Sequence, residues 1–275
     1  MTSVPHLTTA LTGPLQDLES HILANQTEIE HWFRTQWLSS RAPFYSSVDL
    51  RNAGFKVAPV DTNLFPAGFN NLNPAFLPLC VQAVQAAIEH LCPNARRLIV
   101  VPESHTRNLF YLESLATLQG LIEKAGLHVL IGHIDEDRQT RELTLPSGQS
   151  MTQHPIERSG DKLHIGDFEP CIVLLNNDLS DGIPEVLQNV DPAQTLSPTP
   201  AMGWSSRLKS NHFAHYQRVA KEFSEIIDID PWLIDPYFRR CGKIDFQKRE
   251  GDECRAENVA DVLECSMGKY PEYGI

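Results

Sequence analysis

The residues from Val48 to Leu72 carry the densest set of groups that could bind a small charged ligand. Arg51 can hold a carboxylate through two parallel hydrogen bonds, and Lys56 offers a compact positive charge. Asp49 and Asp61 could receive an ammonium group. Three amides that could bind carbonyl or amide groups complete the set: Asn63, Asn70 and Asn71. These residue types fit a zwitterionic amino acid, although the same groups could instead cap one another within a self-contained loop.

Prolines and glycines make this stretch a loop and not a core element. A helix would not tolerate Gly54, Pro59, Pro66 and Gly68 at these intervals. We therefore expect two short extended segments, residues 44–50 and 55–60, that lead into a long polar loop. Ligand-binding groups are commonly found on such loops.

Two further polar clusters follow apolar segments. The run Glu103-Ser104-His105-Thr106-Arg107-Asn108 offers groups for acid–base chemistry or carboxylate recognition, and Glu103 is its candidate site residue. Helix capping by Ser104 or Thr106 is the competing interpretation. A second cluster follows an apolar strand and comprises Asn176, Asn177 and Asp178. These residues could line the same ligand-binding opening as the first cluster, and capping of the next segment is the alternative.

Arg207 and Lys209 form a third candidate group. They alternate in sequence, so in an extended segment both would project to one side and could meet a phosphate or a carboxylate. The chain has neither a P-loop nor a dinucleotide fingerprint, and no serine or cysteine lies in a nucleophile-elbow motif. Its histidines show no zinc-type spacing, so the sequence predicts no metal site within the chain.

The order of apolar and polar segments predicts an α/β fold. Expected strands cover residues 97–102, 127–134 and 171–175, and expected helices cover residues 7–38, 74–92, 109–125, 184–190, 211–226, 232–241 and 251–267. Short segments over residues 142–168 predict an antiparallel excursion. The repeated order of strand, polar loop and helix indicates a Rossmann-like, mainly parallel sheet covered by helices, followed by a mostly helical segment. Its domains are expected at residues 1–193 and 194–275.

The position of the polar clusters follows from this fold. Ligands bind at the carboxyl ends of strands in open parallel sheets. The sheet is therefore expected to present residues 49–71, 103–108 and 176–178 at one edge. The last residues, 267–275, are expected to be a connector with nothing further to pack.

Composition excludes several classes of protein. The formal net charge of −12 argues against a nucleic-acid or anionic-membrane surface, where affinity comes largely from lysine and arginine. No apolar run approaches the roughly 20 residues that cross a bilayer, and the first residues show no secretory signal. We therefore expect a cytoplasmic protein whose six dispersed cysteines are reduced.

Five stretches resemble one known family closely. They are DLRNAGFKVAPVDTNLFPAGFNNL at residues 49–72, PESHTRN at 102–108, LLNND at 174–178, GWSSRLKS at 203–210 and DFQKRE at 245–250. This long set, in fixed order over nearly the whole chain, resembles the proteobacterial type of glutamate-cysteine ligase.

The resemblance implies ATP-dependent joining of the glutamate side-chain carboxylate to the amine of cysteine, the first step of glutathione synthesis. It implies an acyl phosphate intermediate, Mg²⁺ to neutralise phosphates, and an ATP-grasp relative with a Rossmann-like front domain. Family members continue beyond the equivalent of Ile275 into a nucleotide-binding region. The chain is thus expected to be the front and middle portion of the ligase, with ATP and Mg²⁺ bound elsewhere.

The candidate residues take roles in this interpretation. Carboxylate or phosphate charge is assigned to Arg51, Lys56 and Arg207, ammonium binding to Asp49 and Asp61, and orientation to Asn63, Asn70, Asn71, Asn176 and Asn177, while Glu103 and Lys209 complete the substrate-binding set. An alternative of another class stays open, namely a non-catalytic amino-acid-binding module or an inactive remnant of the ligase.

Overall fold

The computed structural model describes residues 13–104, 108–240 and 249–273. The chain forms two compact units that interleave along the sequence. The first unit comprises Met1–Arg41, Val48–Thr62 and Leu208–Ile275, and the second comprises Ala42–Ser47 and Asn63–Arg207. The domain boundary expected at residues 193–194 stays a prediction. Over the described ranges, no helix has both the length and the apolar character needed to cross a bilayer.

The second unit is built on a six-stranded sheet with the order β10-β9-β3-β4-β6-β5. Its strands are β3 (Arg97–Pro102), β4 (His128–His133), β5 (Arg141–Thr144), β6 (Ser150–Pro155), β9 (Ile172–Asn176) and β10 (Thr195–Ser197). All neighbours pair in parallel except β5, which runs antiparallel to β6 at one edge. This confirms the predicted mixed α/β class with a mainly parallel sheet, whereas its Rossmann-like character stays a prediction.

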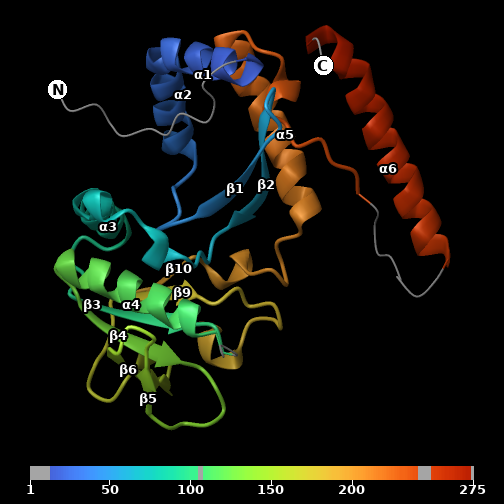
Figure 1. Ribbon diagram of the computed structural model, residues 1–275. Helices are drawn as coiled ribbons and strands as arrows, with labels where there is room; N and C mark the ends of the chain where they lie inside the picture. The colour runs from blue at the N-terminus through green and yellow to red at the C-terminus, as the bar shows by residue number, and fades with distance from the viewer. Residues whose placement is uncertain (1–12, 105–107, 241–248, 274–275) are drawn as a thin grey trace. The chain divides into compact units, whose positions relative to one another are not determined.

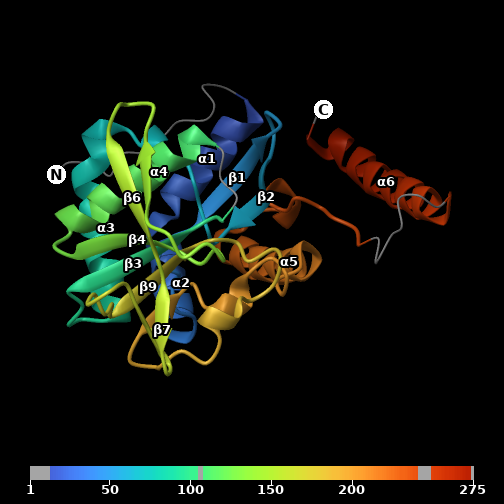
Figure 2. The ribbon, with the colours of Figure 1, turned by 90° about the horizontal axis from the view of Figure 1, so that it is seen from below.

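Both faces of this sheet are buried, as its uninterrupted apolar strands require. Leu98 and Val100 of β3 belong to a core cluster with residues of α3 (Leu77–Leu91) and α4 (Leu109–Lys124). These two helices lie on one face of the sheet (Figures 1 and 2). Ile99 and Val101 point to the other face, because side chains alternate along a strand.

The opposite face is covered differently from the prediction. Its core residues come from loops, from the hairpin of β7 (Glu157–Ser159) and β8 (Lys162–His164), and from the 3-10 turn η3 (Glu185–Leu187). The helix expected over residues 184–190 is therefore wrong, since only this single turn forms. The two hairpins β5–β6 and β7–β8 confirm the expected antiparallel excursion.

The first unit contains α1 (Pro14–Ala24), α2 (Gln26–Ser39), α5 (Lys209–Ile227) and α6 (Arg249–Lys269). The single helix expected over residues 7–38 breaks at Asn25, whose side-chain amide donates to the carbonyl of His21 at 2.8 Å. Residues 7–12 lie outside the described ranges. Trp32 of α2 packs edge-on against Phe223 of α5, with ring centroids 5.4 Å apart, so these aromatics serve the packing of this unit.

Two other expectations fail near the end of the first unit, one for a helix and one for a connector. Only η5 (Pro231–Leu233) forms where a helix was expected over residues 232–241. Pro236 explains this, because a proline inside a helix removes a hydrogen bond and clashes with the preceding turn. Residue 241 lies outside the described residues. The expected connector is also wrong, since η6 (Tyr270–Tyr273) brings Tyr270 against Phe55 and Trp232.

The strands β1 (Ser47–Asn52) and β2 (Val57–Asn63) form a separate two-stranded sheet. The expectation that residues 49–71 as a whole extend from a strand of the main sheet is therefore wrong. Their connection is a tight turn in which the backbone N–H of Gly54 donates to Oδ1 of Asn52 at 2.8 Å. Gly54 has a φ of 83°, a conformation that glycine adopts without steric cost.

Candidate functional site

A polar cavity of about 280 Å³ opens in the second unit, where β3, β4 and β9 reach their carboxyl ends. Parallel pairing places Pro102 of β3 beside Asn176 of β9, so the residues that follow these two strands are neighbours. Glu103 and Ser104 follow β3, and Asn177 and Asp178 follow β9. Ile134, which follows β4, also lines the cavity. Two of the sequence-predicted site residues, Glu103 and Asn177, thus meet at one cavity.

Hydrogen bonds hold the rim of this cavity in place. Oε1 of Glu103 accepts from the backbone N–H of Asp178 at 2.9 Å, which ties the end of β3 to the end of β9. Asn177 is 7% exposed, and its amide donates to the carbonyl of Pro102 at 3.1 Å while its Oδ1 accepts from Leu179 N–H at 3.0 Å. Asn177 therefore orients the backbone of the cavity wall through both ends of its amide.

The loop after Asn177 adopts a costly conformation. Leu179 has a φ of 52°, in the left-handed region that residues with a Cβ avoid, and it is nevertheless buried. Backbone strain of this kind costs of order 1–3 kcal/mol and clusters at functional sites. Oδ1 of Asp178 accepts from both the backbone N–H and the hydroxyl of Ser180, at 2.9 and 2.6 Å, which shapes the turn.

The loop that follows Asn177 packs closely against residues 203–207 of the same unit. A Cβ on Gly203 would lie 2.8 Å from Cβ of Leu179 and 3.0 Å from the carbonyl oxygen of Asp178. The backbone N–H of Trp204 donates to that same carbonyl at 2.8 Å. The guanidinium of Arg207 lies 4.8 Å from the centre of the Trp204 ring. This places Arg207 in the segment that packs against the loop of the cavity.

Asn176 lies in the fold and not on the cavity surface. It is 2% exposed, and its amide donates to the carbonyl of Pro66 at 2.8 Å and to the hydroxyl of Tyr45 at 3.3 Å. Its Oδ1 accepts from the hydroxyl of Tyr111 at 2.8 Å. Burial raises the pKa of both tyrosines above the ordinary range. Asn176 thus joins three separate segments of the second unit.

The other candidate amides of residues 48–72, namely Asn63, Asn70 and Asn71, also belong to the second unit. Oδ1 of Asn63 accepts from Phe65 N–H at 2.8 Å, which forms a local turn. Asn70 and Asn71 are exposed in the short turn η1 (Phe69–Asn71). The backbone N–H groups of Gly68 and Phe69 donate to the hydroxyl of Ser114 on α4, at 2.8 and 3.1 Å.

Lys56 is engaged within the first unit. Its ammonium donates to the backbone carbonyl of Asp235 at 2.7 Å and lies 4.4 Å from the centre of the Trp232 ring. Burial lowers the pKa of Lys56, while the charges of Asp235 and Asp230 oppose that change. Phe55 stacks on Trp232 with ring centroids 5.7 Å apart. The tip of the β1–β2 hairpin is therefore an anchor for residues 230–235.

Among the described residues, the other charged candidates of the first unit line neither of the two cavities found in the second unit. Lys209, the first residue of α5, forms an ion pair with Oδ2 of Asp61 at 2.9 Å. The hydroxyl of Thr62 and Nε2 of His212 share a short hydrogen bond. Asp49 and Arg51 are exposed on β1. Three residues of the polar run after β3, namely His105, Thr106 and Arg107, lie outside the described residues.

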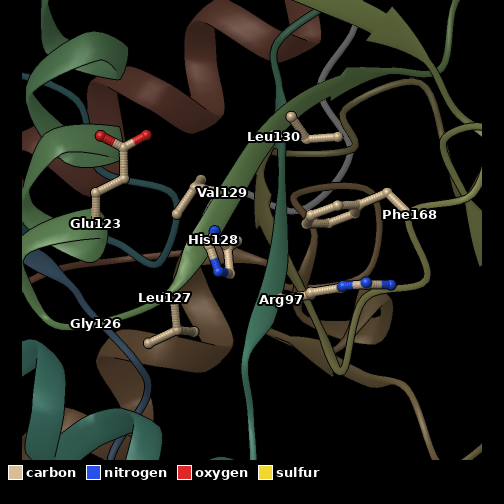
Figure 3. A pocket seen from close by; sticks show the side chains of 8 residues that line it. All are labelled: Arg97, Glu123, Gly126, Leu127, His128, Val129, Leu130 and Phe168. Carbon is tan, nitrogen blue, oxygen red and sulfur yellow. The ribbon is translucent and has the colours of Figure 1, made fainter.

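A larger hollow of about 690 Å³ lies at the opposite ends of β3 and β4, where the strands begin. Figure 3 shows Arg97 beside Phe168 on one side of it and Glu123 of α4 on the other. The Arg97 guanidinium lies 5.4 Å from the Phe168 ring centre and donates to the carbonyl of Asp167 at 3.5 Å. Because parallel sheets bind ligands at the carboxyl ends, the smaller polar cavity is the stronger candidate.

A family profile described as "GshA: Glutamate-cysteine ligase" matches residues 19–275 of the chain. The chain belongs to the glutamate-cysteine ligase family. A solved structure from Methylobacillus flagellatus KT, of a protein assigned as a gamma-glutamylcysteine synthetase, is similar to this family member with 54% identity and a TM-score of 0.89. The similarity covers 98% of this chain and 64% of that one. No curated protein matches this chain.

Sequence reasoning missed part of the site of this glutamate-cysteine ligase family member. Asp178, Ser180 and Asp181 line the cavity, and of these only Asp178 stood in a recognised cluster. The signal for the others was weak, because Ser180 and Asp181 lie in a stretch that also predicts helix capping. A cluster of His133, Asp135 and Asp137 was missed entirely, since its spacing follows no established metal motif.

Proposed function

We propose that this chain carries the glutamate-binding part of an ATP-dependent glutamate-cysteine ligase. The family match over residues 19–275 is the observation that carries this proposal. The chain spans 64% of the length of the similar solved protein, so the activity of the whole protein is inferred from the family. In such a reaction ATP would supply the phosphoryl group that activates the side-chain carboxylate of glutamate, and the amine of cysteine would then displace phosphate.

The chemistry of the cavity favours the α-ammonium group of glutamate as its occupant. Glu103, Asp178 and Asp181 place three carboxylates around it. Opposite charge stabilises the protonated form of an amine and raises its pKa. An amine held there would be a poor nucleophile. The cavity therefore suits the ammonium group that does not react, which belongs to glutamate, better than the attacking amine of cysteine.

Arg207 is the proposed partner of a glutamate carboxylate. Its segment packs on the Asp178 loop through Gly203 and Trp204. A guanidinium can bind a carboxylate through two parallel hydrogen bonds, and stacking on an aromatic ring holds its plane in one orientation. Arg207 lies 4.8 Å from the Trp204 ring centre, which supports this role.

The polar cavity does not favour a nucleotide as its occupant. Carboxylates dominate the polar cavity, and they would repel a triphosphate. The cationic groups Lys56 and Lys209 are engaged by Asp235 and Asp61. We therefore propose that ATP and Mg²⁺ bind in a region that corresponds to the part of the similar solved protein not covered by this chain. We assign no step of phosphoryl transfer to the residues of this chain.

The test is a steady-state assay of ADP release with glutamate, cysteine, ATP and Mg²⁺. The complete ligase is expected to form γ-glutamylcysteine, and Asp178→Asn is expected to raise KM for glutamate while leaving KM for cysteine unchanged. A complete protein that releases no ADP with these substrates would contradict the proposed reaction. Turnover by the 275-residue chain alone would contradict the proposed location of the nucleotide site.

A further inference from the structure

Three side chains at the carboxyl end of β4 form a cluster that the proposed ligase function does not use. His133, Asp135 and Asp137 each offer one ligand atom, and these atoms all lie within 4.8 Å of one another. We propose that they form a binding site for a divalent transition-metal ion such as Mn²⁺ or Zn²⁺. This inference rests on the geometry of the cluster and is independent of the proposed function.

The orientation of His133 is the strongest evidence for a ligand. The side chain is 3% exposed, and Nε2 lies 2.9 Å from the backbone carbonyl oxygen of Gln139. A carbonyl can only accept a hydrogen bond, so Nε2 carries the hydrogen and Nδ1 of the neutral ring carries a lone pair. This Nδ1 is buried and has no hydrogen-bond partner among the described residues.

Such an arrangement is typical of metal-binding histidines. They usually donate the hydrogen of one ring nitrogen to a carbonyl or carboxylate, which fixes the tautomer and turns the other nitrogen toward the ion. Buried polar atoms are rarely left without a partner, so the lone pair on Nδ1 of His133 calls for an electron-pair acceptor. A metal ion supplies one, whereas a carboxylate oxygen does not.

The carboxylates stand on the side of the ring that carries this lone pair. Oδ2 of Asp135 lies 3.9 Å from Nδ1 of His133. Two ligand atoms bound to one tetrahedral ion at about 2.1 Å are about 3.4 Å apart. A small movement of the carboxylates toward Nδ1 of His133 would therefore complete the site. The side chains of Asp135 and Asp137 are 18% and 57% exposed, so each can shift toward the ion.

In this structure the guanidinium of Arg141 supplies the positive charge beside the two carboxylates. Its guanidinium donates to Oδ2 of Asp135 at 2.6 Å and to Oδ1 of Asp137 at 2.5 Å. An ion and a guanidinium held by the same two carboxylates would repel each other. Binding of the ion therefore requires Arg141 to turn away, and its 30% exposed side chain can do so toward solvent. Binding of the ion would thus replace the guanidinium of Arg141 as the partner of the two carboxylates.

The ligand types limit the choice of ion. One imidazole with two carboxylates suits Mn²⁺, Fe²⁺, Co²⁺ or Zn²⁺, whereas Mg²⁺ prefers oxygen ligands and water. A bound ion would fix the segment between β4 and β5. Ile134, which lies between two of the proposed ligands, also lines the polar cavity, so an ion would stiffen one wall of that cavity.

Mn²⁺ is the probe of choice, because it binds carboxylate and imidazole in preference to the cysteine thiolates that Zn²⁺ would also find. The chain is treated with a chelator, exchanged into nucleotide-free buffer and titrated with Mn²⁺ while the free ion is measured by electron paramagnetic resonance. We expect one saturable site. Zn²⁺ is expected to displace the bound Mn²⁺ from it.

Variants separate this site from adventitious binding. Asp137→Asn is expected to weaken Mn²⁺ binding at least about tenfold, since even indirect partners of a metal contribute that much. Arg141→Gln removes the competing charge and is expected to tighten binding several-fold. Glu157→Gln is the matched control, because it changes a carboxylate 3.5 Å from His164, where no second carboxylate completes a cluster among the described residues.

The outcomes are distinct. Equal Mn²⁺ affinity in the original chain and Asp137→Asn would overturn the proposal, and so would weaker binding by Arg141→Gln. Absence of saturable binding in both the original chain and Arg141→Gln would also overturn it. Circular dichroism of each variant verifies that the fold is kept, which is expected because Asp137 and Arg141 are both partly exposed.

Discussion

Replacing Asn176 by alanine is expected to destabilise the second unit while leaving the affinity for an amino acid unchanged. Asn176 stood among the candidate binding residues, but its side chain is buried among Tyr45, Pro66 and Tyr111. Because the Asn176 side chain makes these contacts, its removal is expected to lower the free energy of unfolding. The prediction therefore separates a residue that supports the site from one that touches the ligand.

The size of this destabilisation depends on which buried groups are left without a hydrogen-bond partner. The Pro66 carbonyl loses its amide donor, and an unsatisfied buried acceptor costs about 1–3 kcal/mol. The hydroxyls of Tyr45 and Tyr111 also donate to the backbone carbonyls of Leu175 and Asn176, at 2.6 and 3.1 Å, so each keeps a bond. The two lost bonds to these hydroxyls add at most about 1 kcal/mol each, for a total of about 1–5 kcal/mol.

Urea unfolding followed by circular dichroism measures the stability, and calorimetry with glutamate measures the affinity of the folded variant. A loss of less than about 1 kcal/mol in unfolding free energy would refute the structural role, since a single net hydrogen bond accounts for that much. A large loss of glutamate affinity in a variant that remains folded would show instead that Asn176 reaches the ligand.

Further predictions concern packing and alkaline pH. Gly132→Ala is expected to lower the free energy of unfolding by about 1–3 kcal/mol, because its Cβ would lie 2.6 Å from Cγ1 of Ile156. Gly120→Ala in α4 meets nothing within 4 Å and is expected to raise that free energy by about 0.5–1 kcal/mol. Equal urea midpoints for the two variants would contradict both expectations. The pKa of Tyr216 is raised to about 12 by burial and then by the charge of Asp235. Because this exceeds the value of about 10 in an unfolded chain, its contribution to stability is complete below pH 10 and is lost as pH rises through 12. Tyr216→Phe should remove that loss from the stability–pH curve together with one tyrosinate absorbance change near pH 12, and an unaltered titration would contradict the assignment.

The sequence predicts the core of the second unit well, and the reason is physical. The run Leu98-Ile99-Val100-Val101 is apolar on both faces, as expected of a strand buried on both sides, and β3 forms over the expected residues. Polar residues that directly follow such strands must appear at the carboxyl edge. Glu103 and Asn177 could therefore be found without a structure.

The roles of charged side chains in the first unit depend on contact partners that are distant in sequence. Lys56 looks like a ligand-binding cation, yet its partner carbonyl belongs to Asp235 and its ring partner to Trp232. No local pattern links these segments, so sequence reasoning could not foresee that the hairpin tip is an anchor. Pro236, in contrast, is a local sequence signal against a helix over residues 232–241, because proline disrupts a helix interior.

We propose that the cavity at the ends of β3, β4 and β9 binds the α-ammonium group of glutamate. Calorimetry with glutamate and with glutarate, which lacks that group, tests it most directly. The complete ligase is expected to prefer glutamate at least about tenfold, equivalent to one charge-assisted hydrogen bond of about 1.5 kcal/mol. Asp178→Asn should abolish the preference, and Asp161→Asn, which changes an exposed carboxylate outside the cavity, should keep it. Equal affinity for glutamate and glutarate, or a preference that survives Asp178→Asn, would contradict the claim.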